Sequence, residues 1–238
     1  MTRLSRTLLP ALALVLCARA AAAQSITSPY DYVNKAQSVR VLGGYLFTNP
    51  ELAINDSASA ELGPRSAPFI GAQYQVRAAG PLSVALTVGY SPSERKVFTA
   101  EAVADSTAIR PIDTGRMATA PIGLAELSMI FHLTGPRTWN GIAPFLLASG
   151  GVATELGGRD ATEDDVPATK RYDFGPSFAV GAGLGTDWFP TERLSLRLEL
   201  HGRLWRLSAP EGFIPSTEND ISEWVNASGV TVGAAYHF

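Results

Sequence analysis

Several features are scarce in this sequence of 238 residues. Cysteine occurs once, at Cys17, and charged residues make up 17% of the chain, below the roughly 25% that is usual for soluble domains. After residue 23 no apolar run reaches the roughly 18 residues that a membrane helix needs. These shortages argue against a disulfide-bonded domain, a thiol catalyst and a helical membrane protein. The net charge of −3 gives no indication of nucleic-acid binding.

The first 23 residues have the pattern of a secretory signal peptide. Arg3 and Arg6 precede the apolar stretch 8–17, and three alanines at 21–23 provide small residues for cleavage. A membrane helix is the less favoured interpretation, because the apolar stretch is short. Leu16 does not match the small residue expected before the cysteine of a lipoprotein. We therefore predict a mature chain without cysteine.

The last 15 residues show the clearest regular pattern. Side chains alternate between the two faces of a strand, and here one face is apolar while the other is small or polar. The chain stops on an aromatic residue with no polar tail. A strand that must close a membrane barrel and lie at the lipid boundary accounts for both features. The apolar face comprises Val230, Val232, Ala234, Tyr236 and Phe238.

The same alternation recurs in seven earlier segments, each about as long as the 9–11 residues that span a bilayer when tilted. Together with the last strand they predict an all-β fold, an eight-stranded antiparallel up-and-down transmembrane β-barrel. The parity of 142–154 stays ambiguous, because Leu146 and Leu147 are adjacent. The seven segments are 39–47, 70–78, 82–90, 125–133, 142–154, 178–188 and 194–205.

The connections between these segments alternate in length. Three are short, at 79–81, 135–141 and 190–193. Four are long and polar, at 48–65, 91–117, 155–175 and 207–223. Short periplasmic turns and long external loops are typical of outer-membrane barrels. We predict a signal peptide over 1–23, a polar periplasmic lead without strands over 24–36 and a barrel domain over 37–238.

Two stretches carry a resemblance to a known family. The final strand with its terminal Phe238 resembles the assembly signal of bacterial outer-membrane β-barrels, and 179–185 with the following turn and Leu-Ser-Leu-Arg-Leu-Glu resembles the penultimate hairpin of small OmpA-like barrels. The resemblance implies a monomer in the bacterial outer membrane, in contact with lipid and lipopolysaccharide. It also implies that barrel-insertion machinery reads Tyr236 and Phe238. We expect no counterpart of the peptidoglycan-binding domain of OmpA.

The segment 194–205 bears on whether the barrel lies in lipid or in water. Leucines occupy one face, while Arg197, Glu199, His201 and Arg203 occupy the other. A soluble lipocalin-type barrel would turn the leucines inward, but the signal peptide, the terminal phenylalanine and the loop lengths favour lipid. An arginine facing lipid at the midplane costs roughly 2–4 kcal/mol, so these charges should face the lumen. Aromatics near strand ends suit an interfacial girdle: Tyr45, Tyr90, Trp139, Trp188, Trp205, Trp224 and Phe238.

Six charged residues are predicted to face the lumen. An eight-stranded barrel is just wide enough for side chains to fill it, and charges buried there must be paired. We favour an ion-pair network that plugs the barrel, with Glu199 between two arginines. The alternative is a narrow pore, for which the glycine-rich sixth and eighth strands would leave space. The predicted network comprises Arg40, Arg77, Glu126, Arg197, Glu199 and Arg203.

Other candidate sites are weaker. The three histidines, His132, His201 and His237, should face inward at different heights, which disfavours a shared metal site. Barrels that trim lipid A resemble this fold and use a His, a Ser and an acid, but their His-x-Ser pattern is absent, although Glu199 and His201 could form part of a hydrolytic site. The acidic stretch 159–165 lacks the spacing of an EF-hand, so a solvated loop is favoured over a divalent-cation site.

We therefore expect no enzyme, no cofactor and no metal. The favoured function is a structural or surface-interaction role through four external loops. The alternative is a narrow channel for small solutes, resembling the OmpW-like barrels. A lipid-modifying outer-membrane enzyme ranks third.

Overall fold

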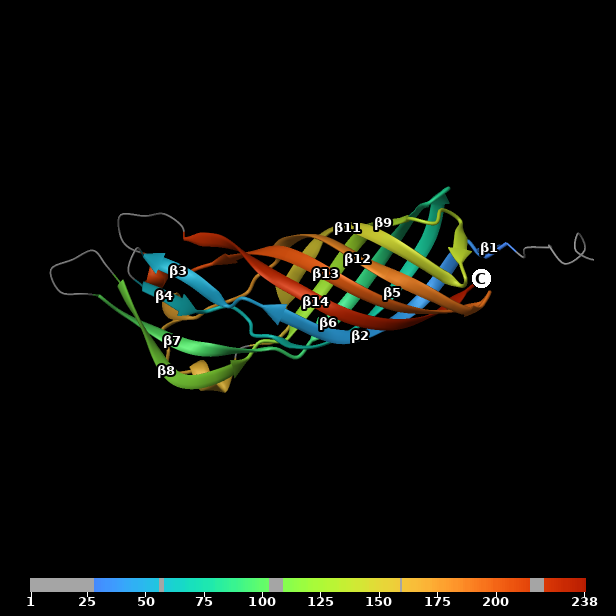
Figure 1. Ribbon diagram of the computed structural model, residues 1–238. Helices are drawn as coiled ribbons and strands as arrows, with labels where there is room; N and C mark the ends of the chain where they lie inside the picture. Colours follow the sequence, from blue (N-terminus) through green and yellow to red (C-terminus); the bar gives the residue numbers. More distant parts are fainter. Residues whose placement is uncertain (1–27, 56–57, 103–108, 159, 215–220) are drawn as a thin grey trace, which may run out of the picture.

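A computed structural model describes residues 28–55, 58–102, 109–158, 160–214 and 221–238 (Figure 1). The predicted signal peptide and the first residues of the lead lie outside the described residues. Among the residues that are described, no helix is long and apolar enough to cross a membrane.

Eight long antiparallel strands close into a barrel, as the sequence predicts. Each strand pairs with its neighbour along the chain, and the last strand pairs with the first to complete the ring. Long side chains on one face of every strand therefore meet inside. The strands are β2 (Gln37–Thr48), β5 (Ala67–Ala79), β6 (Leu82–Ser91), β9 (Ile122–His132), β11 (Ile142–Glu155), β12 (Ser177–Thr191), β13 (Leu194–Ser208) and β14 (Ser222–His237).

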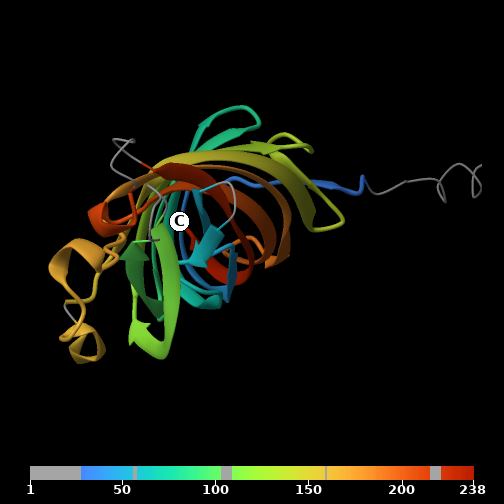
Figure 2. The same ribbon diagram turned by 90° about the vertical axis from the view of Figure 1, so that its left-hand side faces the viewer.

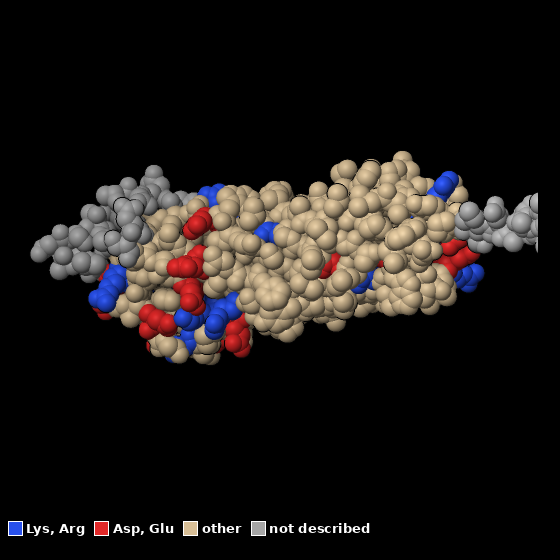
Figure 3. Space-filling model, viewed as in Figure 1, with Lys and Arg blue, Asp and Glu red and all other residues tan. Residues whose placement is uncertain are grey.

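The outer wall of the barrel is an apolar belt. Along β13 exposed and buried residues alternate without interruption, with Leu194, Leu196, Leu198 and Leu200 outside. Figure 3 shows charged side chains mainly at the two ends of the molecule, with an uncharged belt between them. Such a surface would be unfavourable in water and suits hydrocarbon.

Six of the seven aromatic residues predicted for the girdle face outward and are 40–52% exposed. Trp205 is the correction, because its side chain is 1% exposed and points into the barrel. It lies on the inward parity of β13, beside Phe174, whose ring centroid is 5.3 Å away. The direction of this ring therefore follows from its position in the alternation of β13 and not from its nearness to a strand end.

Short turns connect the strands at one end of the barrel, which we call the turn end; the C-terminus also lies there (Figure 1). The lead forms a three-residue strand at this end, which the sequence did not predict. This strand, β1 (Tyr30–Tyr32), pairs with β10 (Arg137–Trp139) from the turn that precedes β11.

The opposite end, which we call the loop end, carries structure that its polar sequence did not indicate. The first loop forms a hairpin of β3 (Glu51–Asn55) and β4 (Ala58–Glu61), and the second forms β7 (Glu94–Ala102) and β8 (Ile109–Thr119). Short 3-10 helices occupy the other two loops. These elements gather around the barrel mouth (Figures 1 and 2). The 3-10 helices are η1 (Ala161–Glu163), η2 (Ala168–Lys170) and η3 (Glu211–Phe213).

One hydrophobic core joins the loops to the barrel. Inward-facing barrel side chains at the loop end contact apolar side chains of the loops, and together they form one buried cluster. Burial of this apolar surface stabilises the loops over the mouth. We call the cluster the apolar cap. Its larger members are Leu42, Leu46, Phe69 and Trp205 from the barrel, with Leu52, Leu62, Tyr172 and Phe213 from the loops.

Candidate functional site: the barrel lumen

Below the apolar cap, charged side chains fill the lumen. Six of them are at most 5% exposed, although they come from strands far apart in the chain. Three are arginines and three are carboxylates, so their formal charges sum to 3 − 3 = 0. We call this set the polar layer. It consists of Arg40 on β2, Glu126 on β9, Asp187 on β12 and Arg197, Glu199 and Arg203 on β13.

Asp187 is the centre of the polar layer on the side of the turn end. Its Oδ1 accepts from Nη2 of Arg40 at 2.9 Å and from Nε of Arg197 at 2.8 Å. Its Oδ2 accepts from Nη2 of Arg197 at 2.6 Å. The Gln73 Oε1 atom accepts from both arginines, at 2.6 and 3.1 Å. The sequence placed Asp187 on the inward face but did not include it in the predicted network.

Arg197 also stacks on an aromatic ring. Its guanidinium carbon lies 4.2 Å from the ring centroid of Phe145, close enough for a cation–π interaction. This ring belongs to β11, whose parity the sequence left open. The structure turns Phe145 and Leu147 inward and Leu146 outward.

A second ion pair lies nearer to the apolar cap. Arg203 donates from Nε to Oε1 of Glu126 at 3.0 Å and from Nη2 to Oε2 at 2.9 Å. This two-pronged geometry is the strong form of an arginine–carboxylate contact. It also corrects the expectation that Glu199 lies between two arginines, because Arg203 is engaged elsewhere. Among the arginines of the polar layer, Arg197 is the one within ion-pair distance of Glu199, with Glu199 Oε2 3.6 Å from Arg197 Nη1.

Arg77 does not join the polar layer. It lies near the turn end of β5, where its Nη1 donates to the backbone carbonyl of Val33 at 2.5 Å. Of the six residues predicted for the network, the structure therefore brings five into the polar layer, and Asp187 takes a position that sequence reasoning missed.

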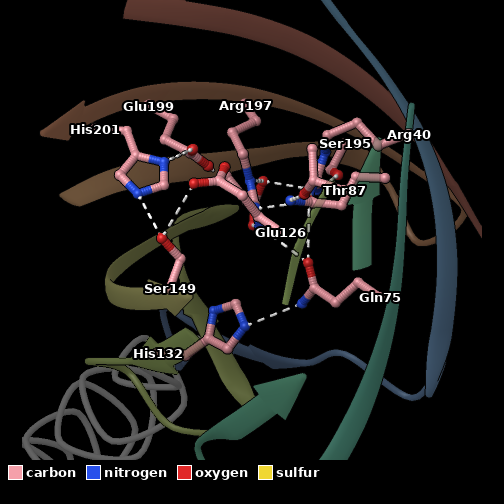
Figure 4. Close-up of polar contacts among 12 residues, drawn as sticks. Arg40, Gln75, Thr87, Glu126, His132, Ser149, Ser195, Arg197, Glu199 and His201 are labelled. Carbon is pink, nitrogen blue, oxygen red and sulfur yellow. Dashed lines mark hydrogen bonds and ion pairs between the residues drawn. The ribbon is translucent and has the colours of Figure 1, made fainter. Parts of the chain in front are cut away.

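Glu126 lies close to Ser149, Ser149 to His201, and His201 to Glu199 (Figure 4). Ser149 Oγ is 3.0 Å from Nε2 of His201, and His201 Nδ1 is 3.6 Å from Oε1 of Glu199. The order Ser–His–Glu is that of a hydrolytic triad, but 3.6 Å is too long for a hydrogen bond. His201 and Glu199 are also buried. Sequence reasoning missed Ser149 because the parity of β11 was ambiguous.

The glycines of β12 make room for these side chains, and do not leave an empty path. A Cβ at Gly181 would lie 2.5 Å from Nε2 of His201 and 2.8 Å from Ser149 Oγ. A Cβ at Gly185 would lie 2.5 Å from the ring of Phe145. The expectation that glycine-rich strands leave space for a pore is therefore wrong on β12, because side chains of neighbouring strands occupy that space.

The histidines lie apart, each with its own partner. His132 Nε2 is 3.4 Å from Gln75 Nε2, and His237 Nε2 is 2.8 Å from Ser195 Oγ. Within the described part of the chain, no group of three or more His, Cys, Asp or Glu could hold a metal ion.

At the loop end, the acidic stretch fastens two loops together instead of lying free in solvent. Glu163 accepts from Nη1 and Nη2 of Arg95 at 2.6 and 2.8 Å, and both side chains are buried. Burial by itself would lower the pKa of Arg95. The hydrogen bonds and negative charge of Glu163 outweigh that effect and raise the pKa of Arg95 above its usual value. Asp165 pairs with Arg116 at 2.8 Å. Residue 159 lies outside the described residues.

Asp160 adds hydrogen bonds to this contact. Its carboxylate accepts from the backbone N of Thr162 at 2.9 Å and from both N and Oγ1 of Thr119 at 2.8 Å. These bonds hold the pKa of Asp160 well below its usual range, with the Thr162 backbone bond first among them. We call the contacts of Asp160, Glu163 and Asp165 with β7 and β8 the interloop latch.

Comparisons with known proteins rest on structure, because no family model and no curated protein matches the sequence. The outer membrane protein OprG from Pseudomonas aeruginosa is 15% identical, with a TM-score of 0.54 over 87% of this chain and 99% of that one. Neisserial surface protein A is 14% identical, with a TM-score of 0.46 over 85% and 97%. The chain therefore has the fold of a small eight-stranded outer-membrane β-barrel. The apolar belt agrees with the predicted location in the bacterial outer membrane.

Proposed function

We propose that this protein is a closed outer-membrane barrel that serves a structural or surface-interaction role through its loop end, which faces outward. One observation carries the proposal: two successive layers of side chains fill the lumen, namely the neutral polar layer and the apolar cap toward the loop end. A water-filled channel would require neither the paired charges nor the hydrophobic core across the mouth.

The polar layer supports closure through its pairing. Charges lining a wet pore are screened by water, whereas charges taken out of water need partners and hydrogen bonds. Asp187 meets two arginines and Glu126 meets a third, all with bonds near 3 Å. This arrangement suits a plug more than a conducting path.

Single-channel recording of the refolded protein in a planar bilayer tests the proposal. We expect no regular conductance steps above those of refolding buffer without protein. Reproducible steps, with ion selectivity that changes in Glu199→Gln, would contradict closure and favour the narrow channel for small solutes.

We propose a non-enzymatic role. The Ser149–His201–Glu199 triplet lies within the filled lumen, where a substrate would have to displace the polar layer. A lipid-modifying activity would require these groups to face lipid, and His201 and Glu199 lie on the inward parity of β13.

For partners, we propose outer-membrane lipid and lipopolysaccharide, with the barrel as a monomer. Arg206 lies on the outward face of β13 near the loop end, in register with Trp224 of β14. Arg206 and Trp224 line a surface hollow of about 490 Å³, together with Phe178. A cation beside aromatic side chains at the membrane boundary suits lipid head groups. Co-purification of lipopolysaccharide, reduced in Arg206→Gln, is the expected result.

We propose that barrel-insertion machinery reads Tyr236 and Phe238, as the family resemblance implies. Both rings face outward at the turn end, and Phe238 exchanges backbone hydrogen bonds with Gln37 where β14 meets β2. Deleting Phe238 should lower the amount of folded barrel in cells, measured by heat-modifiable migration. The control Phe47→Ala removes an equally exposed aromatic at the opposite end of β2. Equal loss in both variants would contradict a specific signal.

A further inference from the structure

The mouth at the turn end contains a small cavity with an excess of positive charge. Three cationic side chains line it, and each comes from a different element: Lys35 from the lead, Arg77 from β5 and Arg137 from β10. The cavity has a volume of about 30 Å³. The lead, which the sequence predicts to be a polar segment before the first strand, is thus part of its wall.

These cations have contacts, but not with carboxylates. Arg77 donates to the Val33 carbonyl, and Arg137 donates to the Tyr32 hydroxyl with its guanidinium carbon 4.5 Å from that ring's centroid. Among the described residues, no carboxylate lies within ion-pair distance of Lys35, Arg77 or Arg137.

The carboxylate that does line the cavity cannot neutralise them. It belongs to Asp187, whose two oxygens already accept from Arg40 and Arg197. The polar layer is neutral as a set, so the charge of the mouth remains in excess. The remaining polar lining offers further hydrogen-bond donors, namely Gln75 and Ser83 with His132 and His237.

We propose that this mouth, which we call the cationic mouth, binds a single oxyanion, a carboxylate or phosphate group. Guanidinium and ammonium donors that line one small cavity favour such a group. The cavity is two to three times the roughly 10–15 Å³ that one water molecule needs, so one anionic group fits and a large ligand does not. The inference does not depend on whether the lumen conducts.

Calorimetric titration of the refolded full chain in zwitterionic micelles at low ionic strength tests this inference, with inorganic phosphate and with succinate as probes. We expect saturable binding of at least one probe. Arg77→Gln and Lys35→Gln should each weaken it about tenfold, which corresponds to a loss of about 1.4 kcal/mol of binding free energy. The Lys35 side chain makes no hydrogen bond or ion pair with any residue that the structure describes, so folding of Lys35→Gln should be unaffected.

Arg193→Gln is the matched control, because Arg193 is exposed at the same end and does not line the cavity. Equal weakening in all three variants would mean non-specific attraction and would overturn the proposal, as would the absence of saturable binding by either probe. Nanodiscs distinguish the source of the anion. If phosphatidylglycerol abolishes phosphate binding that phosphatidylcholine leaves intact, a lipid head group occupies the site. If binding is equal in both lipids, the occupant is a free anion of the periplasm.

Discussion

The two halves of the lumen are closed by different chemistry. Toward the turn end, the polar layer joins charged groups from four strands, and its hydrogen-bonded partners lie up to 147 residues apart in sequence. Toward the loop end, the apolar cap uses hydrophobic side chains of barrel and loops. Buried ion pairs add little net stability, but removing one partner is costly. Hydrophobic contacts lose stability in proportion to the atoms removed. The same barrel should therefore respond to mutation in two distinct ways.

The largest effect is expected for Asp187→Asn. The substitution keeps the shape but removes the carboxylate that neutralises Arg40 and Arg197, so two buried cations lose their partner. Breaking a buried pair costs roughly 3–5 kcal/mol. Urea unfolding followed by heat-modifiable migration should show this fall. The control Asp113→Asn affects an exposed contact 3.6 Å from Lys96 and should cost less than about 1 kcal/mol.

Glu199→Gln provides a comparison with Asp187→Asn within the polar layer. Glu199 approaches one arginine at 3.6 Å and makes no two-pronged contact, so its loss should cost about 1–3 kcal/mol. Asp187→Asn should therefore be the more harmful of the two in the same urea assay. The reverse order would show that the pairing pattern does not determine the stability of the layer.

Leu52→Ala tests the apolar cap. Leu52 is fully buried, but it belongs to β3, outside the barrel sheet. A buried Leu→Ala substitution costs roughly 2–5 kcal/mol of stability. We expect this loss to destabilise the packing of the loops and to leave the barrel strands intact. Limited proteolysis should cleave the loops faster while the urea midpoint of the barrel stays constant. Ala53→Ser, on the exposed face of the same strand, should change neither. A lower barrel midpoint in Leu52→Ala would show that cap and barrel unfold together.

The difference between the two halves also explains what the sequence could predict. Alternation along each strand is local, so it identified the lipid-facing leucines of β13 and the inward direction of Arg40 and Arg197. Which charge meets which is decided by register around the closed barrel. Asp187 and Arg40 are 147 residues apart in sequence, and no local pattern relates them.

The loops were harder to predict for another reason. Their hairpin strands β3 and β4 have five and four residues, too few to show a clear period among the surrounding polar residues. Leu52, Leu62 and Phe213 lie in short apolar stretches within polar segments, and only their meeting in space makes a core. Glu163 likewise belongs to an acidic run, and its pairing with the distant Arg95 turns that run into a latch.

The smallest effect is expected for Asp160 of the interloop latch. Hydrogen bonds from Thr162 and Thr119 lower the pKa of its carboxyl in the folded protein, whereas the unfolded chain should titrate near pH 3.9. The charged form therefore contributes stability that is complete above about pH 5 and declines as the pH falls below about 4. Asp160→Asn lacks this contribution at every pH.

Limited proteolysis of the loops should accordingly proceed faster in Asp160→Asn than in the unmodified protein at pH 7. A protease that stays active in acid can follow the comparison downward, and the two rates should approach each other as the pH falls below about 4. Because Asp160 is only partly buried, solvent screens its charge and the difference should stay modest. Asp113→Asn, on the β7–β8 hairpin that the latch contacts but outside the latch, serves again as the control. Rates that differ by the same factor at every pH would show that the shape of the side chain, and not its charge, holds the two loops together.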